Sequence, residues 1–168
     1  MHEIFIRFSA EKLKQLGDRI DTCLTRLSDE QIWWRGASES NAVGNLVLHL
    51  RGNLGQWILS GAGGAPDTRK RDDEFNATGG TDREELRRLL RERVSEAVTV
   101  ILALTPEQLM TVVQIQKYNL TLLEAVYHVV EHFGQHAAQI MYATKLLTGT
   151  DLGFYGHLKA PQHAETTP

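Results

Sequence analysis

One segment of the chain repeats another, and this repeat constrains the fold more than any other feature of the sequence. Residues 42–58 (AVGNLVLHLRGNLGQWI) align at a constant offset with residues 125–141 (AVYHVVEHFGQHAAQIM). Identical residues fall at Ala42 and Ala125, Val43 and Val126, Val47 and Val130, His49 and His132, and Gln56 and Gln139. Both segments place apolar residues three and four positions apart, which is typical of amphipathic helices. Since each segment follows another helical pattern, the repeat predicts an all-α, four-helix bundle built from two pseudo-repeated helical hairpins.

Helical periodicity predicts four long helices, at residues 4–27, 42–59, 81–104 and 122–148. Capping boxes are expected at the starts of the last two, formed by Thr81 with Glu84 and by Thr121 with Glu124. Gly149 is expected to end the last helix in the left-handed conformation. No segment shows a convincing strand pattern, so the sequence predicts helices alone.

The connections between the long helices differ in character. Short helical turns are predicted at residues 28–34 and 105–110, whereas the glycine-rich, charged segment 61–80 is predicted to be a long loop that is either functional or mobile. A single bundle domain is expected over residues 1–155, followed by a flexible tail at residues 156–168.

Histidines line one edge of the predicted core face in the repeated helices. At about 100° per residue, and taking Phe133 as the centre of the core stripe, His136 lies about 60° to one side, His132 about 100° and His128 about 140°. His49 occupies the position of the first repeat that matches His132. If these two edges face each other in the bundle, His49, His132 and His136 converge.

Three imidazoles from two helices form a familiar site for a first-row divalent metal such as zinc, nickel or iron. A pair of histidines four residues apart is by itself more often solvent-facing or hydrogen-bonded, but the third histidine at the matching position favours a metal site. His128 is as well explained by an exposed or substrate-facing position as by a role as a metal ligand. His2, His157 and His163 stand in terminal segments and are not expected to take part in the site. Candidate acceptors for the second ring N–H groups are Gln139, Gln56, Asn53 and Asn45.

Several stretches of the chain resemble the DinB/YfiT-like superfamily of small bacterial proteins. They are SNAVGNLVLHLRGNLGQWI, RKRDDEF, and HFGQHAAQI followed by GFY, and the resemblance extends over nearly the whole chain. It implies an up-down-down-up bundle whose metal is held by one histidine of the second long helix and an H-x-x-x-H pair of the last, here His49, His132 and His136. It also implies frequent homodimers, bound nickel, zinc or iron, and either transferase or isomerase activity with a low-molecular-weight thiol such as bacillithiol or mycothiol, or metal-dependent hydrolysis.

Groups for catalysis are harder to find than metal ligands. Arg71, Asp72, Asp73 and Glu74 stand in the loop after the second helix, where they would reach a bound substrate, but the favoured interpretation is a solvated run of charges. Trp33, Trp34 and Trp57 either line a pocket or, as is more common for large aromatics at helix ends, serve the core or a dimer contact.

The composition and charge of the chain argue against nucleic-acid and membrane partners. Of the 168 residues, 42% are hydrophobic and 23% are charged, and the formal net charge is −3. Without a basic excess, nucleic acid is not an expected partner. Residues 1–20 are interrupted by charges and predict neither a signal peptide nor a membrane span, so a cytoplasmic protein without membrane partners is expected. The single cysteine, Cys23, lies in an apolar helical pattern and is expected to pack in the core.

Three hypotheses for function follow. The favoured one is an enzyme whose three histidines hold a divalent metal that activates water or a thiol, acting on a small molecule as a metal-dependent hydrolase or a thiol-dependent transferase. The alternative is a non-catalytic metal-binding or stress-response module with the same site. The third is a structural helical dimer without a metal.

Overall fold

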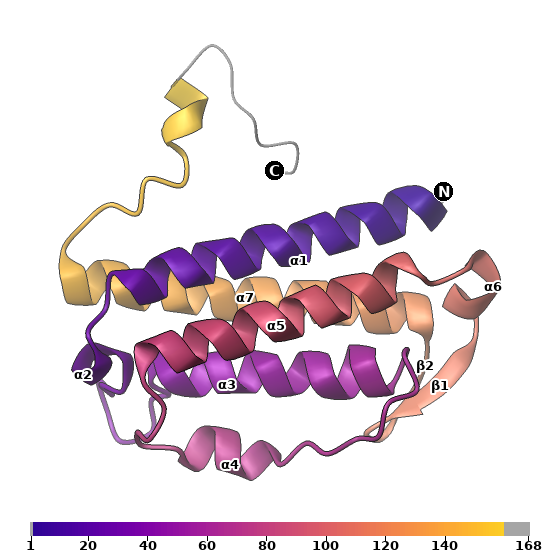
Figure 1. Cartoon of the computed structure of the whole chain (residues 1–168), viewed down its shortest axis with the longest axis horizontal. Coiled ribbons are helices and arrows are strands. Elements are labelled where there is room, and N and C mark those ends of the chain that lie inside the picture. Colours follow the sequence, from indigo (N-terminus) through magenta and orange to yellow (C-terminus); the bar gives the residue numbers. More distant parts are fainter. Residues whose placement is uncertain (1, 160–168) are drawn as a thin grey trace.

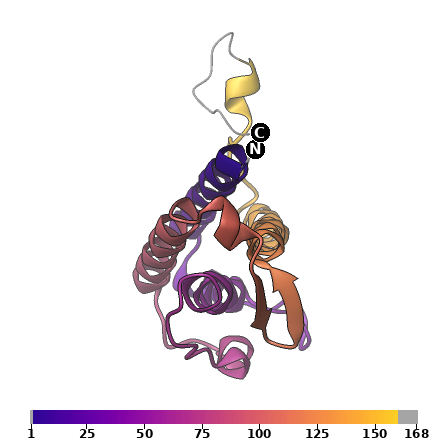
Figure 2. The same ribbon diagram turned by 90° about the vertical axis from the view of Figure 1, so that its right-hand side faces the viewer.

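Four long helices form the framework of the computed structural model, which describes residues 2–159. They are α1 (His2–Thr25), α3 (Val43–Leu54), α5 (Arg83–Leu102) and α7 (Leu122–Thr148). Figure 1 shows α1 and α7 running in one direction and α3 and α5 in the other, which is the up-down-down-up order. In the end-on view of Figure 2, α1 and α3 occupy opposite corners of the bundle and α5 and α7 the other two. α1 and α3 therefore each pack against both α5 and α7, and the predicted all-α bundle is confirmed.

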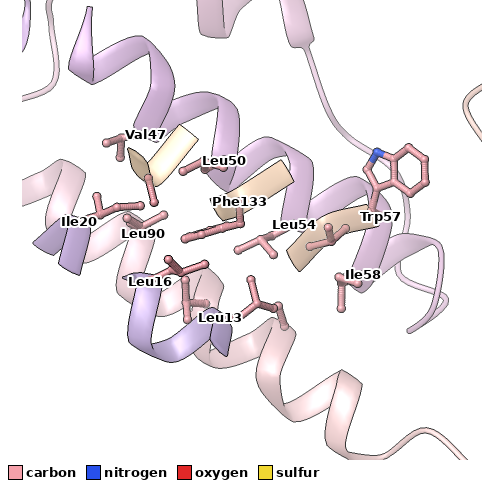
Figure 3. Packing of buried hydrophobic residues seen from close by; sticks show 14 of the residues in the cluster. Leu13, Leu16, Ile20, Val47, Leu50, Leu54, Trp57, Ile58, Leu90 and Phe133 are labelled. Atoms are coloured by element: carbon pink, nitrogen blue, oxygen red, sulfur yellow. The ribbon is translucent and has the colours of Figure 1, made fainter. Parts of the chain in front are cut away.

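The core lies along the axis between the four helices. The apolar stripe of α7, centred on Phe133 as predicted, is fully buried and consists of Val126, Val129, Phe133, Ala137 and Ile140. Figure 3 shows Phe133 in one cluster with Leu16 of α1, Leu50 of α3 and Leu90 of α5. Cys23 is also fully buried, as expected for a packing role, and burial raises the pKa of its thiol.

Helix ends follow the capping signals of the sequence with one exception. Capping boxes begin α2 (Asp29–Ile32), α6 (Pro106–Leu109) and α7, and Gly149 ends α7 with a φ of 66°. The predicted box of Thr81 with Glu84 is wrong by one residue, because the side chain of Asp82 accepts the hydrogen bond from the N–H of Glu85 at 2.9 Å. An ionised carboxylate is the stronger acceptor at the positive end of a helix. The carbonyl of Thr81 accepts instead from Nε1 of Trp33.

A small β-hairpin corrects the prediction that the chain contains no strand. β1 (Val112–Ile115) pairs antiparallel with β2 (Tyr118–Thr121), so that Val112 lies opposite Thr121. Its turn uses Gln116, which has a φ of 56°, where hairpins usually place glycine or asparagine. Ile115 is buried and attaches the hairpin to the bundle.

The segment 61–80 is more ordered than predicted, because it contains the helix α4 (Arg71–Asn76). Asn45 of α3 holds this helix through its side-chain amide. Nδ2 of Asn45 donates to the carbonyl oxygens of Glu74, Phe75 and Ala77 at 2.8 to 3.3 Å. Arg35 donates to the carbonyls of Phe75 and Ala77 as well. These bonds satisfy the end of α4 and fix its side chains against α3.

Two further helical turns complete the described part of the chain. The π-helical turn η1 (Gly55–Ser60) extends α3, and the 3-10 helix η2 (Gly156–Lys159) follows α7. The predicted flexible tail begins at η2, and its residues 160–168, including His163, lie outside the described residues. Within residues 2–159, no helix combines the length and the apolar character needed to cross a bilayer.

Candidate metal centre

Three histidines meet where α3 and α7 lie side by side. Nε2 of His132 lies 3.2 Å from Nε2 of His49 and 3.2 Å from Nε2 of His136. The three candidate ligand atoms all lie within 4.8 Å of one another. His132 and His136 are one turn apart on α7, and the antiparallel packing of α3 brings the matching histidine of the first repeat to the same point. The convergence predicted from the repeat is therefore present.

The spacing of these nitrogens suits a shared metal ion. With metal–nitrogen bonds of about 2.1 Å, ligand nitrogens at octahedral or tetrahedral angles lie about 3.0 to 3.4 Å apart. The two 3.2 Å separations fall inside this interval. Among residues 2–159, this is the only cluster of three histidine, cysteine or acidic side chains with such a spacing.

Glu74 determines which nitrogen of His49 faces the cluster. Its Oε2 lies 3.0 Å from Nδ1 of His49, and both side chains are almost completely buried. Nη2 of Arg69 is equally close to Nδ1, but it also donates to the same Oε2 at 2.8 Å, and a carboxylate is the stronger acceptor. We therefore assign the proton of His49 to Nδ1, which leaves a lone pair on Nε2 directed at His132.

The other end of the cluster is arranged in the same way. Nδ1 of His136 donates to Oε1 of Gln139 at 2.7 Å, so its Nε2 also presents a lone pair. In its neutral form, His132 carries one proton on its ring. The lone pairs of His49 and His136 both face Nε2 of His132, whereas its Nδ1 is buried without a partner. A proton on Nε2 of His132 can be donated to only one of the two neighbouring nitrogens. Without a metal, at least one pair of ring nitrogens therefore faces each other with no proton between them. A divalent cation at this point would satisfy all three, so the residues fit the metal that the resemblance implies.

Metal binding requires neutral imidazoles, and the surroundings of His132 and His136 favour that form. Burial is the largest of the effects that lower the pKa of His132 to about 3, and the neighbouring His136 and His49 contribute to the same shift. Burial also lowers the pKa of His136, against the opposing effect of its bond to Gln139. The net effect favours the neutral form of His132 and of His136 at neutral pH.

Glu74 belongs to the candidate site, although the sequence alone does not indicate this. Residues 69–75 were interpreted as a solvated charge run, and this is wrong for Glu74, which is 8% exposed and faces the bundle. Burial alone raises the pKa of its carboxyl, but hydrogen bonds from Arg69 and His49 outweigh that effect and hold the pKa below its usual value. Gly52 makes the approach possible, because a Cβ there would lie 1.9 Å from Oε1 of Glu74.

The other predicted acceptors have different roles. Asn45 fixes α4, and Gln56 bonds to Asp67, Arg69 and Gln116, so neither contacts a ring nitrogen of the cluster. Oδ1 of Asn53 is buried without a partner. Of the four candidates, Gln139 alone is confirmed by a hydrogen bond to a cluster histidine.

A cavity of about 570 Å³ lies beside the cluster, a volume usual for small-molecule sites. Its wall includes His49 and His132, the hairpin residues Gln116, Tyr118, Asn119 and Leu120, and also Asn53, Trp57, Arg69, Arg71, Glu124 and His128. His128 stacks on Trp57 with ring centroids 4.3 Å apart and has no close contact between its nitrogens and the other three histidines. The structure therefore places His128 on the cavity wall, one of the two positions left open for it. Trp57 is buried, whereas Trp34 is exposed.

Comparisons with known proteins show the family and the fold. The family model described as "Protein of unknown function (DUF1572)" matches residues 2–158. A conserved protein from Enterococcus faecalis has a similar structure, with a TM-score of 0.70, 16% identity, and coverage of 86% of this chain and 97% of that chain. A DinB-like protein from Bacillus subtilis, YjoA, gives a TM-score of 0.68 and 16% identity over 88% of this chain and 96% of that one. No curated protein matches the sequence. The chain thus has the fold of a DinB-like protein and belongs to the family described as "Protein of unknown function (DUF1572)".

Proposed function

We propose that this protein binds one first-row divalent metal ion through His49, His132 and His136 and uses it to transform a small molecule. The observation that supports the proposal best is the meeting of three ring nitrogens of which two are forced, by Glu74 and Gln139, to present lone pairs. When bound, such an ion lowers the pKa of a coordinated water or thiol and polarises a carbonyl group. Zinc, nickel and iron all accept this donor set.

Residues around the three histidines orient the ligand rings and exclude water from one side of the site. Glu74 and Gln139 hold the rings of His49 and His136 in their ligand tautomers, and Arg69 keeps Glu74 charged although it is buried. The rings of His49 and Phe75 pack with their centroids 4.7 Å apart and their planes tilted by 41°, so an aromatic side chain covers one side of His49. These contacts fix the ring orientations and tautomers of His49 and His136 in the metal-free protein.

The cavity beside the cluster favours an enzyme over a non-catalytic metal-binding module. Three protein ligands leave coordination positions free for water or substrate, and the 570 Å³ space bordered by His49 and His132 gives a small molecule access to them. Metal-dependent hydrolysis and transfer to or from a low-molecular-weight thiol are the reactions we expect. A metal-binding or stress-response module would need the ligands but not the cavity.

Metal content of protein purified without a histidine tag tests the proposal. We expect about one equivalent of zinc, nickel or iron per chain by inductively coupled plasma mass spectrometry, and loss of that metal when His132→Ala and His136→Ala are combined. The matched control is His128→Asn, which removes a neighbouring imidazole of the same helix and should leave the metal content unchanged. Metal retained by the double variant would refute the site.

Activity separates the two metal-binding hypotheses. Metal-loaded protein should be assayed against a panel of esters and of electrophiles that accept a thiol, with and without a low-molecular-weight thiol. Turnover that disappears on chelation and returns with metal supports the enzyme. A metal-loaded protein inert to the whole panel would support the non-catalytic module instead.

A further inference from the structure

We infer that the cavity beside the metal centre takes a small molecule carrying a carboxylate, which Arg71 binds while another group of the molecule reaches the metal. This inference rests on the proposed metal site and names the class of substrate for it. It also assigns a role to a residue of the charged stretch 69–75 that the metal site itself does not use.

Arg71 packs against an aromatic ring and makes no side-chain hydrogen bond among the described residues. Its guanidinium carbon lies 4.7 Å from the centroid of the Phe75 ring one turn along α4, and that ring packs against His49 at 4.7 Å. A stacked guanidinium keeps its N–H groups free in the plane of the fork. Within residues 2–159, the structure gives Arg71 no ion-pair partner, although it lines the cavity. Arg71 is exposed to solvent, so its donors are available to a ligand in the cavity.

The other charged groups on the cavity wall already have partners. Arg69 binds both oxygens of Glu74, and Glu124 accepts from the backbone and hydroxyl of Thr121 in the cap of α7. Arg71 thus places on the cavity wall a positive charge that has no ion-pair partner among the described residues, next to Phe75, whose ring packs against that of His49. One planar guanidinium matches one carboxylate in both geometry and charge, whereas a phosphate dianion would keep an uncompensated charge.

The rest of the wall suits the body of such a molecule. Trp57, His128 and Tyr118 supply aromatic surface, with the Trp57 and Tyr118 rings 6.3 Å apart. Two buried polar atoms on cavity residues, Oδ1 of Asn53 and Nε1 of Trp57, have no hydrogen-bond partner within the described chain. Unpaired buried polar atoms are rare in folded proteins, so these two atoms are candidates to bond a ligand or a water molecule.

Matched probes on cobalt-loaded protein test the inference by spectroscopy. Cobalt in place of the native metal gives visible d–d bands, and a coordinated thiolate adds a charge-transfer band in the near ultraviolet. The probes are short mercaptocarboxylates of increasing length, each paired with the neutral amide of the same chain. Titrations give the dissociation constant of every probe for the wild type, for Arg71→Met and for the control Arg51→Met, which removes the same charge from α3 at a residue outside the cavity.

The wild type should bind the carboxylate of at least one chain length about tenfold more tightly than its amide, because a charge-assisted hydrogen bond replaces a neutral one. Arg71→Met should abolish this preference while leaving the cobalt bands and the affinity for the amide unchanged, and Arg51→Met should retain the preference. Equal binding of acid and amide at every length, or a preference that survives in Arg71→Met, would overturn the inference while the metal site stands. Absence of cobalt bands in the wild type would overturn the metal site and this inference together.

Discussion

Replacing Glu74 with glutamine is the most informative single change to the proposed site. The substitution keeps the shape of the side chain and removes its charge. Oε2 accepts from His49 at 3.0 Å and from Arg69 at 2.8 Å, and Oε1 accepts a second bond from Arg69 at 2.8 Å. An amide has one acceptor and one donor end, so either orientation places an N–H group against another donor. The variant therefore loses at least one charge-assisted bond in a buried position.

The expected magnitudes follow from those contacts. An unmatched donor and the uncompensated charge of Arg69, whose side chain is 4% exposed, should lower the free energy of unfolding by about 2 to 3 kcal/mol. His49 would donate to a neutral acceptor and become a weaker ligand. Loss of such a supporting carboxylate typically reduces metal affinity about 10- to 100-fold, or about 1.4 to 2.7 kcal/mol.

Two assays measure these effects separately. Urea denaturation of the metal-free proteins gives the change in stability, and competition with a chromophoric chelator gives the metal affinity. Asp72→Asn is the matched control, because it removes the same charge from an exposed position of α4. Metal affinity of Glu74→Gln equal to that of the wild type and of Asp72→Asn would refute the supporting role assigned to Glu74.

Three further predictions follow from the same geometry. Gly52→Ala should weaken metal binding about tenfold or more, because its methyl group would lie 1.9 Å from Oε1 of Glu74 and displace the carboxylate; unchanged affinity in the chelator assay would contradict this. The free energy of unfolding of the metal-free protein should fall as the pH drops from about 6.5 to about 5, above the range in which carboxyl groups titrate, because the unfolded chain takes up protons that the buried His132 and His136 do not; a fall no larger than that of the variant combining His132→Ala and His136→Ala in urea titrations would contradict the lowered pKa values. Leu90→Ala should cost about 2 to 5 kcal/mol of stability in the same denaturation assay while leaving metal affinity intact, and a loss below 1 kcal/mol would, on the usual cost of core cavities, refute its central packing.

The bundle and the histidine cluster were predictable because both depend on regular periodicity. Helical spacing determines which residues share a face, and a constant offset between the two repeats determines which positions match. His49 and His132 stand on matching positions, and the antiparallel contact of α3 with α7 places those positions together. Most capping boxes were predictable as well, because each depends only on an N-cap residue and a partner three positions later.

The hairpin and the role of Glu74 depend on information that local patterns do not contain. The turn between β1 and β2 uses Gln116 in a left-handed conformation, so the usual glycine or asparagine signal is absent. Glu74 stands among charged residues, and its burial results from the space left by Gly52 and the carbonyl bonds made by Asn45. Both of these residues lie more than twenty positions earlier in the chain. A charge run and a buried ion pair therefore look alike until the fold is known.

Metal-edge X-ray absorption on metal-loaded protein without a histidine tag is the most direct test of the central claim. The account predicts a first shell containing three imidazole nitrogens at about 2.0 to 2.1 Å for zinc, with the outer-shell scattering of three rings and with water or another light ligand completing the coordination. In the variant His49→Ala, the same spectrum should show one imidazole fewer. A wild-type spectrum with fewer than three imidazoles, or one that His49→Ala leaves unchanged, would contradict the assignment of the metal to the meeting point of α3 and α7.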